Sequence, residues 1–261
     1  MLRALWSAST GMSAQQMNID NISNNLANVN TTAYKRSNIQ FQDLMYQVEK
    51  AAGAPTTSGS QIPTGVQYGH GSRVSATSKL FTQGTLQNTG VQLDLAIEGE
   101  GFFEVIQTDG TSAYTRDGTF KLDSTGKIVT VDGLQVKGLD TIDAGTTTIT
   151  INADGSFSTI VNGQVVQKAP LTLARFPNSA GLKSAGHNLF VTTEASGTAE
   201  TGGTPGQNGF GTIAQGYLEL SNVEVVQEMV NMIVAQRAYE VNSKAIQAAD
   251  EMLGQANSLR R

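Results

Sequence analysis

Hydrophobic residues recur every seven positions at both ends of the chain, and this spacing constrains the fold more than any other feature. At the N-terminal end the repeat places Leu5, Met12, Ile19 and Leu26 in one register, and Ala8, Gln15, Ile22 and Val29 three residues later. The C-terminal end repeats the spacing with Val225, Met232, Tyr239, Ile246 and Leu253, and Met229, Ala235, Ala249 and Ala256 widen its stripe. A sustained seven-residue repeat predicts helices that pack as a coiled coil. Ser221 to Glu224 match a capping box, which places the start of the C-terminal helix there.

Asparagines form a second stripe on the N-terminal helix. Asn18, Asn21, Asn25 and Asn28 are three or four residues apart, so they lie beside the hydrophobic stripe. An amide donates and accepts hydrogen bonds without charge, whereas a charged face repeated around an axis would repel its copies. The stripe therefore predicts a surface between copies of the chain. Because asparagine is a poor helix former, a loop here is the alternative.

The middle of the chain has the rhythm of short antiparallel strands. Turn dipeptides recur every seven to twelve residues, as at Asp109-Gly110, Asp132-Gly133 and Asn162-Gly163, and the run at 146–151 is rich in Thr and Ile. Before it, residues 51–72 carry no charge and five glycines. That segment is either a flexible linker or a functional extension.

Composition excludes several classes of protein. Only 15% of the 261 residues are charged, against about 25% in ordinary domains, so the surface is unusually neutral. The formal net charge of −5 argues against nucleic acid as a partner. Cysteine is absent, so no disulfide or thiol chemistry is expected. No cleavable signal peptide and no apolar run long enough to span a membrane are found.

Catalytic motifs are weak throughout. Glu98 and Glu100 would share one face of a strand, with Asp94 nearby, which is the kind of carboxylate pair that a glycosidase uses, but no aromatic sugar platform is close. His70 and His187 both lie in Gly- and Asn-rich context, which is typical of exposed loops. We expect no catalytic, metal or cofactor site.

Three motifs together resemble the bacterial flagellar rod and hook proteins. The N-terminal motif comprises Ser23 to Val29 with Thr31 and Ala33 to Arg36; the C-terminal motif comprises Ser221 to Val223 with residues 228–246; the central one comprises residues 98–105 and 113–120. The similarity spans the chain, and its length and uncharged segment are similar to the distal-rod branch of that family. One departure is Ala33, where many members have Gly, so a left-handed turn is not expected there.

The resemblance and the patterns together predict an α+β fold with long N- and C-terminal helices forming a coiled coil and a β-rich domain between them. We expect a coiled-coil helix over 1–46, an extended uncharged brace over 47–85, a β-rich outer domain over 86–215 and a second coiled-coil helix over 216–261. The predicted assembly surface comprises Leu5, Met12, Asn18, Ile19, Asn21, Ile22, Asn25, Leu26, Asn28, Val29, Val225, Met229, Met232, Tyr239, Ile246 and Leu253.

The family implies a structural, non-enzymatic subunit that polymerises with itself into a rigid helical tube and transmits torque from motor to hook. It also implies contacts with proximal rod, hook and ring proteins, a place in the basal body from periplasm to outer membrane, and export through the type III apparatus without a cleaved signal. Within the family, a proximal rod or hook subunit is the alternative. A secreted enzyme of cell-wall remodelling and an adhesin are the rivals from other classes.

Overall fold

The computed structural model describes residues 2–53, 63–139, 141–143 and 145–258, and its fold is α+β. The chain divides into two compact units. A helical unit holds residues 1–26, 37–78 and 224–261, and a β unit holds residues 27–36 and 79–223. Part of the predicted brace, residues 54–62, lies outside the described residues.

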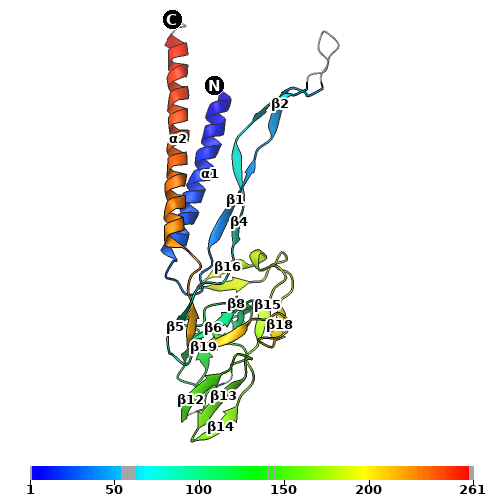
Figure 1. Cartoon of the computed structure of the whole chain (residues 1–261), viewed down its shortest axis with the longest axis vertical. Helices are drawn as coiled ribbons and strands as arrows, with labels where there is room; N and C mark the ends of the chain where they lie inside the picture. Colours follow the sequence, from blue (N-terminus) through cyan, green and yellow to red (C-terminus); the bar gives the residue numbers. More distant parts are fainter. Residues whose placement is uncertain (1, 54–62, 140, 144, 259–261) are drawn as a thin grey trace. The chain divides into compact units, whose positions relative to one another are not determined.

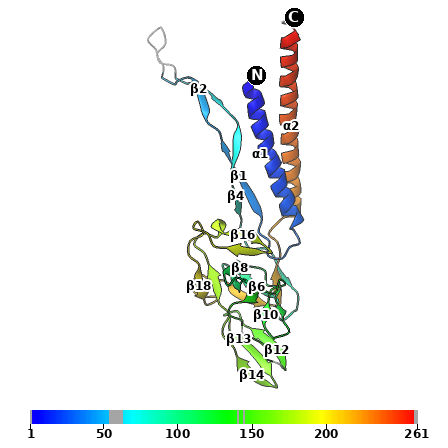
Figure 2. The ribbon, with the colours of Figure 1, turned by 180° about the vertical axis from the view of Figure 1, so that it is seen from behind.

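The helical unit contains both helices, α1 (Leu2–Ala27) and α2 (Val225–Ser258), which lie side by side in Figures 1 and 2. The predicted capping box is wrong, because α2 begins after Glu224. The Ser221 hydroxyl instead accepts the N–H of Val223, only two residues along, at 3.3 Å. Asn222 therefore remains outside the helix, where its side chain has other partners.

A ribbon and an arm complete the helical unit (Figure 1). Strand β1 (Ser37–Asp43) pairs with β4 (Ser72–Lys79), and β2 (Tyr46–Lys50) pairs antiparallel with β3 (Val66–Gly69). Every residue of β2 and β3 is exposed. An isolated two-stranded hairpin is marginally stable in water. Within its own unit the arm is contacted by Arg3 of α1, whose guanidinium lies 5.5 Å from the centre of the Tyr68 ring.

Short antiparallel strands build the β unit, as the turn spacing predicts. Its seven-stranded sheet runs in the order β16 (Lys183–Gly186), β17 (Leu189–Val191), β8 (Ser112–Thr115), β7 (Phe103–Ile106), β11 (Gln135–Val136), β10 (Ile128–Val129) and β9 (Lys121–Leu122). A three-stranded sheet holds β12 (Thr146–Ile151), β13 (Phe157–Val161) and β14 (Gln164–Gln167). The remaining pairs are β15 (Leu173–Arg175) with β18 (Glu200–Gly203), β19 (Thr212–Gln215) with β6 (Leu95–Glu98), and β20 (Tyr217–Glu219) with β5 (Leu86–Asn88); a 3-10 turn, η1, covers Ser179–Gly181.

The turn glycines serve two different purposes. Gly110 has φ of +81°, the left-handed conformation that a tight turn needs and that glycine adopts at little cost. Gly118, in the same Asp-Gly context, is not left-handed. A Cβ there would collide with the carbonyl oxygen of Leu95, so glycine permits two backbones to approach closely.

Two hydrophobic clusters form the core of the β unit. The larger gathers Leu95, Ile97, Phe103, Val105, Phe120, Phe157 and Leu171 with ten further buried residues from most of the strands. The smaller joins Phe102, Tyr114, Ala174, Phe176, Leu182 and Phe190, whose aromatic rings pack edge to face. These clusters give the polar side chains described next a rigid support.

The turn after α1 contradicts the expectation for Ala33. This residue has φ of +55°, so the left-handed turn is present although no glycine occupies the position. Left-handed backbone costs an L-residue about 1–2 kcal/mol. The buried N–H of Ala33 donates to the carbonyl oxygen of Glu219 at 2.7 Å, and this bond offsets the strain.

Candidate assembly surfaces and polar junction

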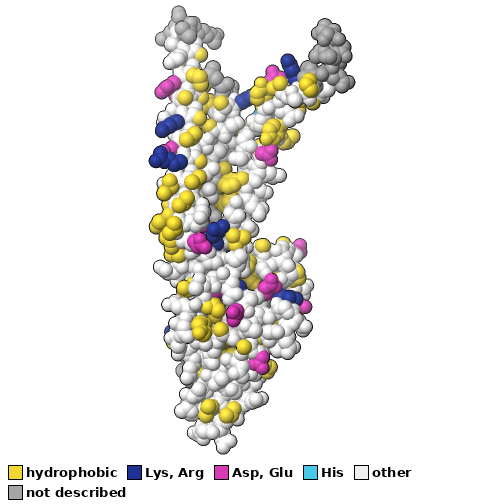
Figure 3. Space-filling model, in the orientation of Figure 1, with side chains coloured by type: hydrophobic (Ala, Val, Ile, Leu, Met, Phe, Trp, Pro, Cys, Tyr) yellow, Lys and Arg dark blue, Asp and Glu magenta, His cyan; other side chains and the backbone are white. Residues whose placement is uncertain are grey.

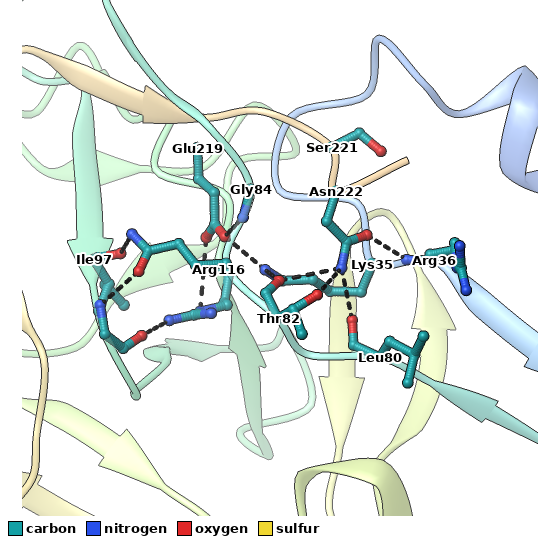
Figure 4. A network of polar contacts seen from close by, with 12 residues as sticks. Lys35, Arg36, Leu80, Thr82, Gly84, Ile97, Arg116, Glu219, Ser221 and Asn222 are labelled. Carbon is teal, nitrogen blue, oxygen red and sulfur yellow. Dashed lines mark hydrogen bonds and ion pairs between the residues drawn. The ribbon is translucent and has the colours of Figure 1, made fainter. Parts of the chain in front are cut away.

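Three segments of the β unit that are far apart in sequence converge on the carboxylate of Glu219 (Figure 4). Lys35, from the segment after α1, donates from Nζ to Glu219 Oε1 at 2.6 Å. The backbone N–H of Gly84, from the segment after β4, donates to the same oxygen at 2.8 Å. Arg116 Nε lies 3.8 Å from Glu219 Oε2. The Glu219 side chain in β20 therefore contacts three segments that are distant from one another in the sequence.

The charges of this junction are buried and unequal in number. The side chains of Lys35 and Glu219 are fully buried, and that of Arg116 is nearly so. The guanidinium of Arg116 also donates to the carbonyl oxygens of Gly99 and Gly101. Two cations thus share one carboxylate. Burial, and then the charge of Arg116, lower the pKa of Lys35 from 10.5 to about 8, although Glu219 opposes the shift.

Asn222 fastens the same segments through its amide (Figure 4). Its Oδ1 accepts the backbone N–H of Arg36 at 2.7 Å, and its Nδ2 donates to the carbonyl oxygen of Leu80 at 2.8 Å and to Thr82 Oγ1 at 2.9 Å. A single amide therefore joins the chain just after α1, just after β4 and just before α2. Asparagine suits the position because it donates and accepts at once.

The lowered pKa of Lys35 predicts how stability changes with pH. Between about pH 8 and 10.5 the unfolded chain retains the lysine proton and the folded chain has lost it, so the free energy of unfolding rises with pH. This contribution is complete above pH 10.5 and is lost as pH falls through 8. Its slope is at most about 1.4 kcal/mol per pH unit.

Amide hydrogen exchange of β7 and β8 at several pH values, corrected for intrinsic exchange, measures this effect in the β unit. The single tryptophan, Trp6, is unsuitable because it lies in α1, within the helical unit. Lys35→Met should remove the rise between pH 8 and 10.5. An equal rise in the variant would assign it to other groups.

Within the helical unit, two of the predicted interface asparagines bond to their own chain. Asn21 and Asn25 both donate from Nδ2 to the carbonyl oxygen of Ser37 at 2.9 Å, and Asn25 Oδ1 accepts the Ser37 N–H at 2.9 Å. Asn25 Nδ2 also lies 3.4 Å from Oε2 of Glu228 in α2. These amides fix the start of β1 against α1 and link α1 to α2.

The predicted assembly residues differ in how far they are buried within the chain. Ile22 and Asn25 are buried. The half-buried members are Leu5, Met12, Asn18, Ile19, Asn21, Leu26, Asn28, Val29, Val225, Met232, Ile246 and Leu253. Met229 and Tyr239 are exposed, at 50% and 39% of their surface.

A second hydrophobic face on α2 was missed by the sequence reading. Its members are Val226, Val230, Ile233, Val234, Val241 and Met252, each at least 49% exposed. At 3.6 residues per turn they lie opposite the buried positions Glu228, Ala235 and Ala249. Figure 3 shows hydrophobic side chains gathered along α2 and over the arm. Exposed apolar patches of this kind mark interaction surfaces.

The signal for this face was present but interrupted. Arg237 and Lys244 fall within it and interrupt its apolar residues. The seven-residue repeat from Val225 to Leu253 is unbroken, so the repeat marks only the other face of the helix. The arm adds Met45, Tyr46, Val48 and Tyr68, of which Met45 is 86% exposed. The face on α2 therefore lies outside the predicted assembly surface, whereas Val48 and Tyr68 of the arm fall within the predicted brace at 47–85.

The candidate catalytic residues do not form a site. Glu98 and Glu100 are both exposed. His187 is 72% exposed, with Nδ1 at 3.2 Å from Asp132 Oδ2, and His70 lies between β3 and β4. Among the residues that the structure describes, no three His, Cys, Asp or Glu side chains gather as a metal ion would need. None of the described helices has the length and apolarity that a membrane span requires.

Three parts of the chain match families of flagellar proteins. Residues 5–35 match the model of the flagella basal body rod protein, residues 96–159 match the D1 domain of the flagellar hook protein FlgE/F/G, and residues 214–259 match the C-terminal region of the flagellar basal body rod FlgEFG protein. The two helices and the β unit are therefore those of a flagellar rod and hook type of protein.

Full-length relatives narrow the class. The chain is 48% identical over 265 residues to the flagellar basal-body rod protein FlgG of Borreliella burgdorferi, with 100% of both chains covered. It is 44% identical to FlgG of Caulobacter vibrioides, covering 99% of this chain and 100% of the relative, and 39% identical to FlgG of Bacillus subtilis, covering 100% of both. The chain belongs to the flagellar basal-body rod family and is similar throughout to its FlgG members.

Membership in this family confirms the prediction of a structural subunit of the flagellar rod. The relatives are structural rod proteins rather than enzymes, so the alternative of a cell-wall-modifying enzyme is not supported. The motifs at both ends of the chain were sufficient to identify the family.

Proposed function

We propose that this chain is the subunit of the distal rod and that it polymerises into a rigid helical tube which transmits torque from the motor to the hook. The observation that carries the proposal is the second hydrophobic face of α2. Helix α2 buries one face beside α1, and its opposite, apolar face is exposed. That exposed face is available to a further copy of the chain. A contact of this heterologous kind that does not close on itself produces a helical filament.

In the proposed tube the terminal helices of neighbouring copies pack as a coiled coil around the axis, and the predicted assembly residues contribute to those contacts. The neutral surface favours such stacking, because few like charges are brought together. Within this arrangement, the exposed arm and the uncharged segment at 51–72, which includes β3 of the arm, brace adjacent copies. That segment favours the distal rod over the proximal rod or hook alternative.

The proposed setting is the basal body between periplasm and outer membrane. There the tube would join proximal rod proteins at one end and the hook protein at the other, with ring proteins around it. The subunit would reach this position unfolded, through the flagellar type III apparatus, without a cleaved signal peptide. The named relatives, which are basal-body rod proteins, support this setting.

Electron microscopy of the purified full-length chain tests the proposal. Isolated basal bodies that end at the proximal rod supply seeds, so that a slow nucleation step does not hide elongation. We expect the seeds to extend by a helical tube whose length grows with subunit concentration. If concentrated subunits remain single particles beside unextended seeds, the chain is not a rod polymer of this kind.

A further inference from the structure

The β unit contains a hollow of about 730 Å³ that the proposed assembly does not use. It lies beside β7 and β8 and is bounded by the segment that connects β17 to β18. It is an open depression in the surface, and its outer wall is formed by exposed residues that include Thr192, Glu194 and Thr198. The lining is mixed, with polar and apolar surface in about equal parts, and several of its residues carry hydroxyl groups, for example Ser112, Thr192 and Thr198.

Tyr114 supplies a fixed hydrogen-bond donor in this hollow. Its side chain is only 4% exposed, and its ring packs edge to face on Phe176 with the centroids 4.8 Å apart. Within the described part of the chain its hydroxyl has no hydrogen-bond partner, and the oxygen is open to solvent whereas the ring is buried. Burial, and then the charge of Glu104, raise the pKa of Tyr114, so the hydroxyl keeps its proton at neutral pH.

Glu104 supplies acceptor oxygens with a compensated charge. It is 5% exposed, and its Oε1 accepts from Ser112 Oγ and from Lys137 Nζ, both at 2.8 Å. Within the described residues, no hydrogen bond is made to the second oxygen, Oε2. The hollow therefore presents a donor and an acceptor whose positions are fixed by neighbouring side chains.

We propose that this hollow binds an uncharged oligosaccharide, with Tyr114 donating to a sugar oxygen and Glu104 accepting from a sugar hydroxyl. Sugar hydroxyls both donate and accept, which matches the mixed lining. An anionic ligand would meet Glu104 and Glu194, and a purely apolar ligand would leave the hydroxyl lining unpaired. Only the choice of sugar rests on the proposed function, since a rod crossing the periplasm passes through the glycan strands of the cell wall.

Ligand-observed NMR on the full-length monomer tests the proposal, with tri-N-acetylchitotriose as the probe and maltotriose for comparison. We expect saturable binding of the acetylated trisaccharide, and Tyr114→Phe should weaken it about fivefold, the effect of one lost hydrogen bond. This substitution keeps the ring and its contact with Phe176, and the amide spectrum of the variant verifies its fold. Thr198→Val, on the exposed wall of the hollow, should also weaken binding.

Tyr217→Phe is the matched control, because Tyr217 lies in the same unit, is 36% exposed and does not line the hollow. Preference for the acetylated sugar would assign the site to wall glycan, and equal binding of both sugars would support a general oligosaccharide site. Absence of binding at about 10 mM, or equal affinity in wild type and Tyr114→Phe, would overturn the proposal. Tyr114→Phe should still extend rod seeds, so a failure of this inference is separable from a failure of the proposed polymer.

Discussion

Replacing Val230 with glutamate should abolish extension of rod seeds while leaving the monomer folded. Val230 belongs to the second hydrophobic face of α2 and is 49% exposed. The residues one turn away on either side, at 226, 227, 233 and 234, are uncharged. Glutamate is a better helix former than valine, so α2 should persist in the monomer, whereas in the tube the carboxylate would be buried with no cation beside it on its own helix. An uncompensated buried charge costs about 3–5 kcal/mol, which lowers the affinity of each contact roughly 150-fold to 5,000-fold.

Gln236→Glu is the matched control for this experiment. Gln236 is exposed on α2, outside the hydrophobic face, and the substitution adds the same charge to the same helix. Seed extension followed by electron microscopy, with circular dichroism of the monomer, separates assembly from folding. Extension of Val230→Glu at the wild-type rate would show that this face is not a contact between copies.

Local patterns predicted much of the fold, because they reflect interactions between residues close in sequence. The seven-residue repeats located both helices, and the turn dipeptides located the strands of the β unit. The start of α2 was not predicted correctly. The capping-box residues at 221–224 fit a helix start by sequence, but Asn222 is held by the segments around Arg36 and Leu80, which keeps the chain extended until Val225.

Long-range contacts explain what the sequence could not predict. Glu219 and Lys35 are 184 positions apart, and nothing in either local sequence marks them as partners. The asparagine stripe raises the same difficulty, because a helical wheel shows which residues share a face and not what covers that face. Asn21 and Asn25 prove to be bonded to Ser37 of the same chain. The apolar positions of the second face between Val226 and Val241 lie outside the predicted seven-residue repeat, and Arg237 interrupts them.

Replacing Glu219 with glutamine should be among the most destabilising conservative changes in the β unit. The variant retains the shape of the side chain but leaves Lys35 without its ion-pair partner, and leaves Arg116 with the charge of Glu100 alone. We expect the free energy of unfolding to fall by about 3–5 kcal/mol. Amide hydrogen exchange of the β-unit strands in wild type and variant, and guanidinium denaturation of both, measure the loss.

A comparison among variants tests whether one carboxylate serves both cations. Lys35→Met should cost less than Glu219→Gln, because Glu219 then keeps Arg116 as a partner. Lys35→Met combined with Glu219→Gln should cost less than the two single changes added together, since the first removes one of the unpaired charges. Glu200→Gln breaks the exposed pair with Arg175 and should cost at most about 1 kcal/mol. If Glu219→Gln costs no more than Glu200→Gln, the junction contributes no more than a surface ion pair, and the three segments must be held by the Asn222 amide and the surrounding core.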